Sequence, residues 1–381
     1  MHPSYLRQFH ASQIFHALRA HPGITQRELA ELSGCDKSTV SLILKRFEDI
    51  GLVERYAGNT NGRPGRTPEV LRISSLTGLL IGMHLEFETM RIVAAGIDGT
   101  RISMKSYPIP KSPEDLAEVT RNGIAELCQS IDRDVAEIRS VGVTLPGLVA
   151  SGGGLAQSSN LKWYSVAVPE LLQNITGAPV YIDNDTNAAT MAEYLFGACG
   201  HLSDFIMLDS GIGLGGGIFL DGRLFRGKSG FSGELGHIKV VKDGRICGCG
   251  SCGCLSAYLS EPAIVQRAAR VLPVTTLEEL FALAAAGDRD ALNIFYEAGG
   301  FLGIALSNLT NIFNTPAIVL GGLLARMWPY IEASTRRSLE DNAMRAPLAD
   351  LEIITSDLSL EPLPSGGIAL ALEGFTALGS L

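Results

Sequence analysis

Cysteine and histidine side chains gather in one short stretch of this 381-residue chain. Four cysteines stand within eight residues, at positions 247, 249, 252 and 254, and His237 precedes the first of them by ten residues. Zinc favours four nitrogen or sulfur ligands in a tetrahedron, so His237 with three of the four thiols would complete a closed site and leave one cysteine over. Free thiols are one alternative, and disulfides this close in sequence would form strained rings. The spacing therefore predicts a structural zinc ion.

A carboxylate also stands where catalytic bases are often found. The apolar segment Val180–Ile182 ends in Asp183-Asn184-Asp185, shortly before a helix-like segment at 188–197. In α/β enzymes a carboxylate at a strand end, beside a helix N-terminus, can take a proton from a substrate. The alternative is a helix cap, because Asp and Asn are favoured at that position.

Glycines follow two other predicted strands. Five glycines fall within 211–217, directly after the apolar segment Phe205–Leu208, and Gly321-Gly322 follow Ala317–Leu320. Glycine lets the backbone approach a ligand closely, so such loops can cradle phosphate, although plain hairpins use glycine as well. Leu79–Ile97, with a turn near Phe87–Glu88, and Ile138–Val143 are further strand-like segments. Strands that alternate with helices predict an α/β body.

The first 75 residues have a different pattern. Apolar residues at helical spacing predict a first helix that ends near His21-Pro22-Gly23, and Thr25 with Glu28 forms a capping-box signature for a second helix at about 26–33. Asp36 is placed to cap a third helix, whose apolar stripe is Val40, Ile43, Leu44, Phe47 and Ile50. Segments 52–55 and 70–73 then predict a hairpin with a basic tip at 59–66.

This order of elements predicts a winged helix-turn-helix that binds DNA. Short hydroxyl side chains early in the third helix can approach base edges, while cations there and in the wing can reach phosphates or a minor groove. The alternative is a three-helix protein-interaction module with a charged, solvated face. The candidate DNA-binding residues are Lys37, Ser38, Thr39, Ser41, Lys45, Arg46, Arg63 and Arg66.

Composition and charge agree with this division. Residues 1–75 carry ten Lys and Arg against seven Asp and Glu, whereas the whole chain has a net charge of −9. A weakly basic head on an acidic body suits a head that meets phosphates. With 46% hydrophobic residues the chain is globular rather than disordered. We expect a cytoplasmic protein, nucleoid-associated when bound to DNA, because the sequence shows neither a transmembrane segment nor a secretory signal.

Four stretches make the chain from Leu79 onward resemble the ROK family of repressors, open reading frames and sugar kinases. They are IDNDTNAA at 182–189, GIGLGGGI at 211–218, SGELGHIKV at 232–240 and CGCGSCGCL at 247–255. The resemblance implies a two-lobed, actin-like sugar kinase fold with a zinc-binding insertion and a cleft between the lobes. Family repressors add an N-terminal winged helix, as here. We expect a DNA-binding domain at 1–75, an N-terminal lobe at 76–190 and a C-terminal lobe at 191–381.

The resemblance also implies site residues. The zinc ligands carried over are His237, Cys247, Cys249 and Cys254, with Cys252 as the extra thiol. The implied contacts to an effector sugar are Asn160, Asn184, Asp185, Glu234 and His237. Carboxylates and amides suit sugars because hydroxyl groups both donate and accept hydrogen bonds. One position departs from the pattern, because Ser256 stands where the family usually has a glutamate that contacts the sugar.

A second departure concerns ATP. Active family kinases resemble one another in an Asp-x-Gly-Gly-Thr loop that holds the phosphates, but here the run at 84–89 is His-Leu-Glu-Phe-Glu-Thr. A carboxylate about 4 Å from a phosphate charge costs roughly 1–4 kcal/mol, so this loop predicts that ATP binding is badly weakened. A base without its phosphate cradle should not transfer a phosphoryl group. We therefore expect no catalytic residue, and Asp185 is interpreted as a sugar-hydroxyl acceptor.

Together these features predict a sugar-responsive transcriptional regulator, a repressor, that binds operator DNA as a homodimer or homotetramer and has no membrane partner. One alternative is an ATP-dependent sugar kinase that retains a DNA-binding head. The other is a sugar-independent regulator whose cleft is vestigial, a hypothesis that rests on Ser256 alone.

Overall fold

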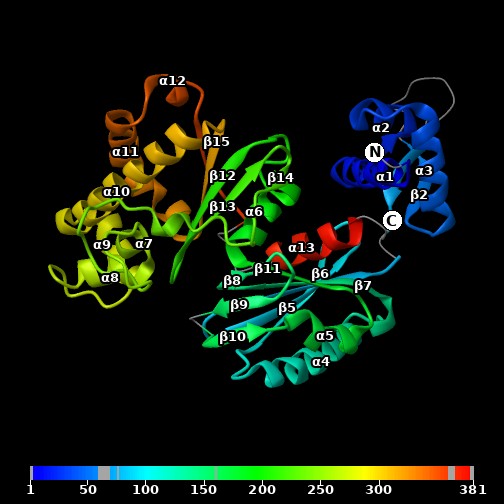
Figure 1. Ribbon diagram of the computed structural model, residues 1–381, viewed down its shortest axis with the longest axis horizontal. Helices are drawn as coiled ribbons and strands as arrows, with labels where there is room; N and C mark the ends of the chain where they lie inside the picture. Colours follow the sequence, from blue (N-terminus) through cyan, green and yellow to red (C-terminus); the bar gives the residue numbers. More distant parts are fainter. Residues whose placement is uncertain (1–2, 59–68, 75–76, 159–160, 359–364, 378–381) are drawn as a thin grey trace. The chain divides into compact units, whose positions relative to one another are not determined.

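The computed structural model describes residues 3–58, 69–74, 77–158, 161–358 and 365–377 (Figure 1). The chain divides into two compact units. The first comprises residues 1–147, 153–183 and 367–381, and the second comprises residues 148–152 and 184–366. The first unit therefore contains both the N-terminal elements and the end of the chain.

The N-terminal head consists of three helices and a small sheet. Its elements are α1 (Pro3–Ala20), β1 (Ile24–Thr25), α2 (Gln26–Ser33), α3 (Lys37–Asp49), β2 (Val53–Ala57) and β3 (Glu69–Ile73). Both predicted helix starts are confirmed: Thr25 and Glu28 form a capping box, and the Asp36 carboxylate accepts hydrogen bonds from the amides of Ser38 and Thr39. The strands β2 and β3 pair antiparallel, as the hairpin prediction requires, and β1 adds a third strand that the sequence did not indicate.

One residue of the predicted apolar stripe is not in the core. Val40, Ile43, Leu44 and Phe47 are buried, but Ile50 is 52% exposed because α3 ends at Asp49 and the chain turns there. Gly51 follows with a φ of +72°, a conformation that favours glycine. The helix therefore ends one residue before the last position of the predicted apolar stripe.

The rest of the first unit is built on a five-stranded sheet in the order β11-β7-β4-β5-β6. The strands are β4 (Leu79–Leu85), β5 (Thr89–Gly96), β6 (Arg101–Pro108), β7 (Ile138–Leu145) and β11 (Val180–Asn184). Consecutive strands β4, β5 and β6 pair antiparallel, and β7 joins the free side of β4 in parallel. The remaining elements are α4 (Pro113–Ser130), η1 (Val135–Glu137), β9 (Leu155–Ser158), β10 (Trp163–Val166), α5 (Val168–Thr176) and α13 (Ser365–Thr376).

The second unit repeats this plan with a sheet in the order β14-β13-β12-β15-β16. Here β12, β13 and β14 pair antiparallel, and β15 and β16 continue in parallel on the other side of β12. The strands are β8 (Leu148–Val149), β12 (Phe205–Ser210), β13 (Leu214–Leu220), β14 (Arg223–Leu224), β15 (Ala317–Gly321) and β16 (Glu352–Thr355). The helices are α6 (Asp185–Phe196), η2 (Leu235–His237), α7 (Ser256–Leu259), α8 (Glu261–Ala268), α9 (Leu277–Ala285), α10 (Arg289–Phe313), α11 (Gly322–Asn342) and α12 (Arg345–Leu348).

The C-terminal helix α13 packs closely within the first unit. A Cβ at Gly142 would meet the carbonyl oxygen of Gly367 at 2.2 Å, so glycines let the helix lie directly on the sheet. At the end of α13 the Phe375 ring lies 5.9 Å from the Phe15 ring of α1, and Thr376 Oγ1 lies 3.2 Å from His16 Nε2. The last helix of the chain is thus in contact with the head.

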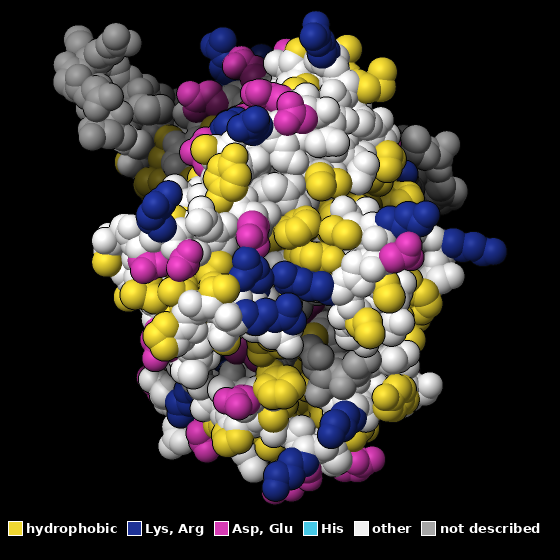
Figure 2. All heavy atoms as spheres, turned by 90° about the vertical axis from the view of Figure 1, so that its left-hand side faces the viewer, with side chains coloured by type: hydrophobic (Ala, Val, Ile, Leu, Met, Phe, Trp, Pro, Cys, Tyr) yellow, Lys and Arg dark blue, Asp and Glu magenta, His cyan; other side chains and the backbone are white. Residues whose placement is uncertain are grey.

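Within the described part of the chain, no helix is long and apolar enough to cross a membrane. On the face shown in Figure 2, Lys and Arg side chains gather near the centre, with apolar and acidic side chains around them. The charge on this face is therefore mixed rather than of a single sign.

Candidate functional sites

The candidate metal ligands meet at one point in the second unit. His237 ends η2, and Cys247, Cys249 and Cys254 lie in the loop before α7. One donor atom from each of these four residues lies within 4.8 Å of the others. Tight turns fold the loop: the Gly250 amide donates to the Cys247 carbonyl, and Gly253 has a φ of +74°. Cys252 is exposed and is not part of this group.

The spacing of the donors can be compared with a tetrahedral metal site. Zinc–sulfur bonds of about 2.3 Å and zinc–nitrogen bonds of about 2.05 Å place two sulfurs about 3.8 Å apart, and a sulfur and a nitrogen about 3.6 Å apart. The Cys249 and Cys254 sulfurs are 3.8 Å apart, and Cys247 Sγ lies 3.6 Å from His237 Nδ1. Lys239 Nζ lies 3.0 Å from Cys254 Sγ. These residues could hold a metal ion.

The other ring nitrogen of His237 faces a carboxylate. His237 Nε2 lies 3.6 Å from Glu234 Oε2. Burial raises the pKa of Glu234, the positive charge of His237 opposes this rise, and the negative charge of Asp185 adds to it. Three of the predicted sugar contacts, Asp185, Glu234 and His237, therefore lie close together in the second unit.

Asn184 and Asp185 begin α6. Asn184 Oδ1 accepts hydrogen bonds from the amides of Thr186 and Asn187, so Asn184 is the helix cap. Asp185 is the first residue of the helix, and its Oδ1 accepts one hydrogen bond from the Thr186 amide. A helix N-terminus also favours negative charge, which stabilises the Asp185 carboxylate. The remaining predicted contact, Asn160, lies outside the described residues. Ser256, the position that departs from the family pattern, is the first residue of α7.

The glycine run at 211–217 serves the packing of α6. A Cβ at Gly215 would meet Thr186 Oγ1 at 2.1 Å, and a Cβ at Gly217 would meet Thr190 Oγ1 at 1.8 Å. Both glycines belong to β13, which pairs antiparallel with β12. These glycines therefore let α6 lie against the sheet, and Gly211 and Gly213 form the turn between the two strands.

The loop that corresponds to the kinase phosphate loop is filled by its own side chains. His84 Nδ1 lies 2.8 Å from Thr144 Oγ1, and His84 Nε2 lies 3.3 Å from Glu86 Oε1. Arg91 and Thr89 also donate to the Glu86 carboxylate. Hydrogen bonds from His84 and then Arg91 lower the pKa of Glu86 to about 2, although burial opposes this. A permanent carboxylate held by a histidine and an arginine thus stands in this turn, and sequence analysis did not foresee the role of Arg91.

In the head, six of the eight predicted DNA-binding residues lie on α3. Lys37, Ser38, Ser41, Lys45 and Arg46 are exposed on α3, and Thr39 is half-buried. The hydroxyl groups of Ser38 and Thr39 donate to the capping residue Asp36, so only their oxygen lone pairs remain for other partners. Arg63 and Arg66 lie outside the described residues. Sequence analysis missed Leu42, which is 63% exposed among these polar residues and is not part of the buried stripe.

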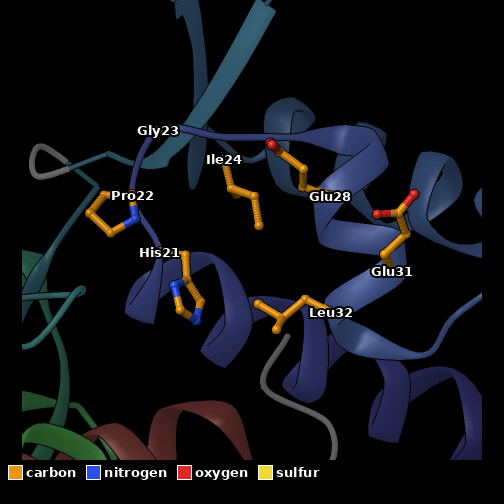
Figure 3. A pocket seen from close by; sticks show the side chains of 7 residues that line it. All are labelled: His21, Pro22, Gly23, Ile24, Glu28, Glu31 and Leu32. Carbon is orange, nitrogen blue, oxygen red and sulfur yellow. The ribbon is translucent and has the colours of Figure 1, made fainter.

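A hollow of about 690 Å³ lies beside α2 in the head (Figure 3). Its charged lining residues are Glu28 and Glu31, and the Glu28 carboxylate accepts the capping hydrogen bonds from Thr25. Arg27 pairs with Glu31 at 3.0 Å. Because its charged lining is acidic, this hollow is unsuited to phosphate.

Comparisons with known proteins match the chain in two separate segments. A model of the ROK family matches residues 84–372, and a model of the MarR family matches residues 12–64. The chain is 28% identical over 369 residues to the xylose repressor of Caldicellulosiruptor bescii, and the match covers 92% of each chain. It is 25% identical over 371 residues to the N-acetylglucosamine repressor of Escherichia coli O157:H7, covering 93% of this chain and 90% of that one.

Solved structures of ROK family proteins are also similar to this chain. A ROK family transcriptional regulator, described as a homologue of the E. coli MLC protein, has a TM-score of 0.83 at 25% identity and covers 98% of this chain and 97% of its own. A ROK family glucokinase from Streptomyces griseus, in complex with glucose and AMPPNP, has a TM-score of 0.67 at 26% identity and covers 77% of this chain and 98% of its own. The predicted fold class, a winged helix-turn-helix followed by an actin-like sugar kinase fold, is confirmed.

Proposed function

Since this chain belongs to the ROK family, we propose that it is a sugar-responsive transcriptional repressor whose head binds operator DNA and whose kinase-like body binds the effector. The relatives that match nearly the whole chain are a xylose repressor and an N-acetylglucosamine repressor. The observation that carries the proposal is that one chain has both features: α3 presents an exposed face with basic residues, and Asp185, Glu234 and His237 are retained close together in the body.

The effector site uses Asn160, Asn184, Asp185, Glu234 and His237. Asp185 and Glu234 supply carboxylate oxygens that accept hydrogen bonds from sugar hydroxyls, and the ring of His237 supplies a donor. A charge-assisted hydrogen bond of this kind contributes roughly 1.5–3 kcal/mol, so two or three of them distinguish one sugar from another. Ser256, shorter and neutral where the family usually has a glutamate, points to an unusual sugar or a larger derivative.

The metal of the cluster is zinc, held by His237, Cys247, Cys249 and Cys254 as a structural ion. The donor spacing supports this identity, because the Cys249–Cys254 and Cys247–His237 separations are those expected of a tetrahedral zinc site. When bound, zinc would fix the ring of His237 by its Nδ1 and turn the Nε2 side toward Glu234.

The body has lost ATP phosphotransfer. The Glu86 carboxylate is ionised throughout the physiological pH range and is held by Arg91 and His84, so it would repel a nucleotide phosphate. An ATP-dependent sugar kinase with a DNA-binding head is the second candidate, and the retained Asp185 is the observation that favours it. ATP consumption with a panel of hexoses, pentoses and N-acetylated sugars separates the two functions.

The repressor acts in the cytoplasm, at the nucleoid when bound to DNA, as a homodimer or homotetramer. Paired heads fit a palindromic operator with half-sites about one helical turn apart, 34–36 Å. A sugar must prefer one conformation of the body for the response to occur, and a coupling of about 1–3 kcal/mol, or 5- to 150-fold in operator affinity, is sufficient.

The direct test is the fluorescence anisotropy of the protein on its own upstream DNA, titrated with a sugar panel without ATP. Release or tightening by one sugar is expected, and Asp185→Asn should blunt this response while leaving operator binding intact. An Asn side chain can still accept the hydrogen bond from the Thr186 amide, so α6 keeps its cap. The matched control is Asp221→Asn in the β13–β14 turn, where a φ of +53° also suits Asn.

Binding that is indifferent to every sugar would favour the vestigial-cleft alternative. If Asp185→Asn abolished operator binding in the absence of sugar, the effector role of Asp185 would be wrong.

A further inference from the structure

The side of α3 that faces away from the core of the head carries one apolar residue. Val40, Ile43, Leu44 and Phe47 form the buried side of this helix. Successive residues of a helix are turned by about 100°, so the direction directly opposite to the buried stripe falls between the side chains of Ser38 and Leu42. The Leu42 side chain points about 30° away from that direction. Leu42 is 63% exposed, more than any other large apolar side chain described in the head.

Exposure alone does not explain Leu42, because single exposed leucines are common on protein surfaces. Its neighbours are more informative. Ser38, Lys45 and Arg46 lie three or four residues from Leu42, so they share its face of the helix. The leucine thus stands between one hydroxyl group and two cations in the first half of α3. The N-terminal part of a recognition helix is the part that reaches base edges in the major groove.

The base edges in the major groove include one apolar group. Thymine alone among the four bases carries a C5-methyl group there, and apolar side chains recognise it by contact. Lys37, Lys45 and Arg46 are exposed on the same helix and complement the phosphates on either side of the groove. We propose that Leu42 is a specificity-determining residue that contacts the methyl group of one thymine in each operator half-site. This inference rests on the proposed DNA-binding function and adds a base preference to it.

The contribution of one methyl contact to the binding free energy can be calculated. Burial of one methyl or methylene group contributes about 0.8 kcal/mol, which is about a four-fold change in affinity. Replacement of the contacted thymine by uracil removes only this methyl group and leaves base pairing unchanged. The cost should therefore be about four-fold per half-site and should occur at one position of the half-site.

The experiment begins with DNA duplexes selected by the full-length protein from a random pool. Each thymine of the selected site is then replaced by uracil, and affinities are measured for the wild type and for Leu42→Ala. The wild type should lose about four-fold at one thymine per half-site, whereas Leu42→Ala should bind the thymine and uracil duplexes equally at that position. Because Leu42 is exposed, the variant should keep the thermal stability of the wild type.

Leu32→Ala is the matched control. Leu32 is 52% exposed on α2 and lines the acidic hollow, so it tests the loss of an exposed leucine outside α3. This control should retain the full thymine preference. A third variant, Leu42→Gln, offers an amide that can bond to adenine, and selection with it should change the preferred base at the same position only.

The inference would be overturned if the wild type bound every uracil-substituted duplex as tightly as its thymine counterpart, or if the thymine preference persisted in Leu42→Ala. A pool in which no sequence is enriched would instead refute the DNA-binding function itself. The two failures are therefore distinguishable.

Discussion

Acidification should destabilise the head, because one of its histidines is buried where a positive charge is unfavourable. His16 of α1 is held against α13, where Nε2 lies 3.2 Å from Thr376 Oγ1. The Thr376 hydroxyl donates its one proton to the Leu372 carbonyl, so toward His16 it can only accept a hydrogen bond. His16 is therefore the donor, which corresponds to the neutral tautomer with its proton on Nε2. His16 Nδ1 is buried and has no hydrogen-bond partner among the described residues. Burial, and then the charge of Arg19, lower the pKa of His16 to about 4.

The sign and the size of the effect follow from this pKa. In the unfolded chain His16 titrates near 6.5, so between pH 6.5 and 4 the unfolded state binds more protons than the folded state. Stability therefore falls as the pH falls through this window. The loss attributable to His16 is about 2 kcal/mol between pH 7 and pH 5, and it approaches about 3 kcal/mol below pH 4.

Amide hydrogen exchange of α1, read by mass spectrometry at pH 7 and pH 5 and corrected for intrinsic rates, measures the local opening free energy. His16→Gln is the informative variant, because its amide can donate to Thr376 Oγ1 but does not titrate. The opening free energy of the wild type should fall by about 2 kcal/mol more than that of the variant. His21→Gln is the control, because His21 is exposed. Its opening free energy should fall between pH 7 and pH 5 as much as that of the wild type. If the wild type and His16→Gln lost protection in parallel, a buried neutral His16 would be refuted.

Three further predictions concern the other sites. Cys254→Ser should lose the bound metal ion as measured by elemental analysis, whereas Cys252→Ser should retain it, because Cys252 is outside the ligand group; equal metal content would exclude Cys254 as a ligand. Lys45→Ala should weaken operator binding and reduce the steepness of the plot of log affinity against log salt concentration by about one. The control is the same substitution at Lys242, an exposed lysine of the second unit. An unchanged slope for Lys45→Ala would show that Lys45 does not contact phosphate. The wild type should consume no ATP with any sugar of the panel, and sugar-dependent turnover would restore the kinase hypothesis.

The local features of the fold could be predicted from the sequence, because their causes are local. Thr25 and Glu28 are three residues apart, and Asp36 bonds to amides two and three residues away, so each cap can be identified from adjacent letters. The cysteine spacing similarly restricts the ligand group to one loop and one histidine. Ile50 was predicted wrongly because helical periodicity continues past the residue at which the backbone turns.

Features that depend on distant segments could not be predicted in this way. His16 and Thr376 are 360 residues apart, and no pattern in the sequence links them. The glycines of β13 look like a phosphate-binding run, yet two of them are small because Thr186 and Thr190 of α6 lie against them. The partner of Glu86 is nearer in sequence, because Arg91 stands five residues further along the chain, but it is the pairing of β4 with β5 that brings the two side chains together. Tertiary packing decided the role of each of these residues.

The metal group and the proposed effector group share one residue, and this has a consequence for the order in which the site forms. His237 faces the cysteine cluster through Nδ1 and Glu234 through Nε2, and Glu234 in turn lies near Asp185. A metal ion bound through Nδ1 requires the remaining proton of the neutral ring to be on Nε2, which makes His237 a donor toward the carboxylates. A metal ion bound in this way would therefore set the hydrogen-bonding pattern of the proposed effector site before any sugar arrives. On the proposed function, a body that has replaced its phosphate loop but kept this arrangement would recognise a sugar without phosphorylating it.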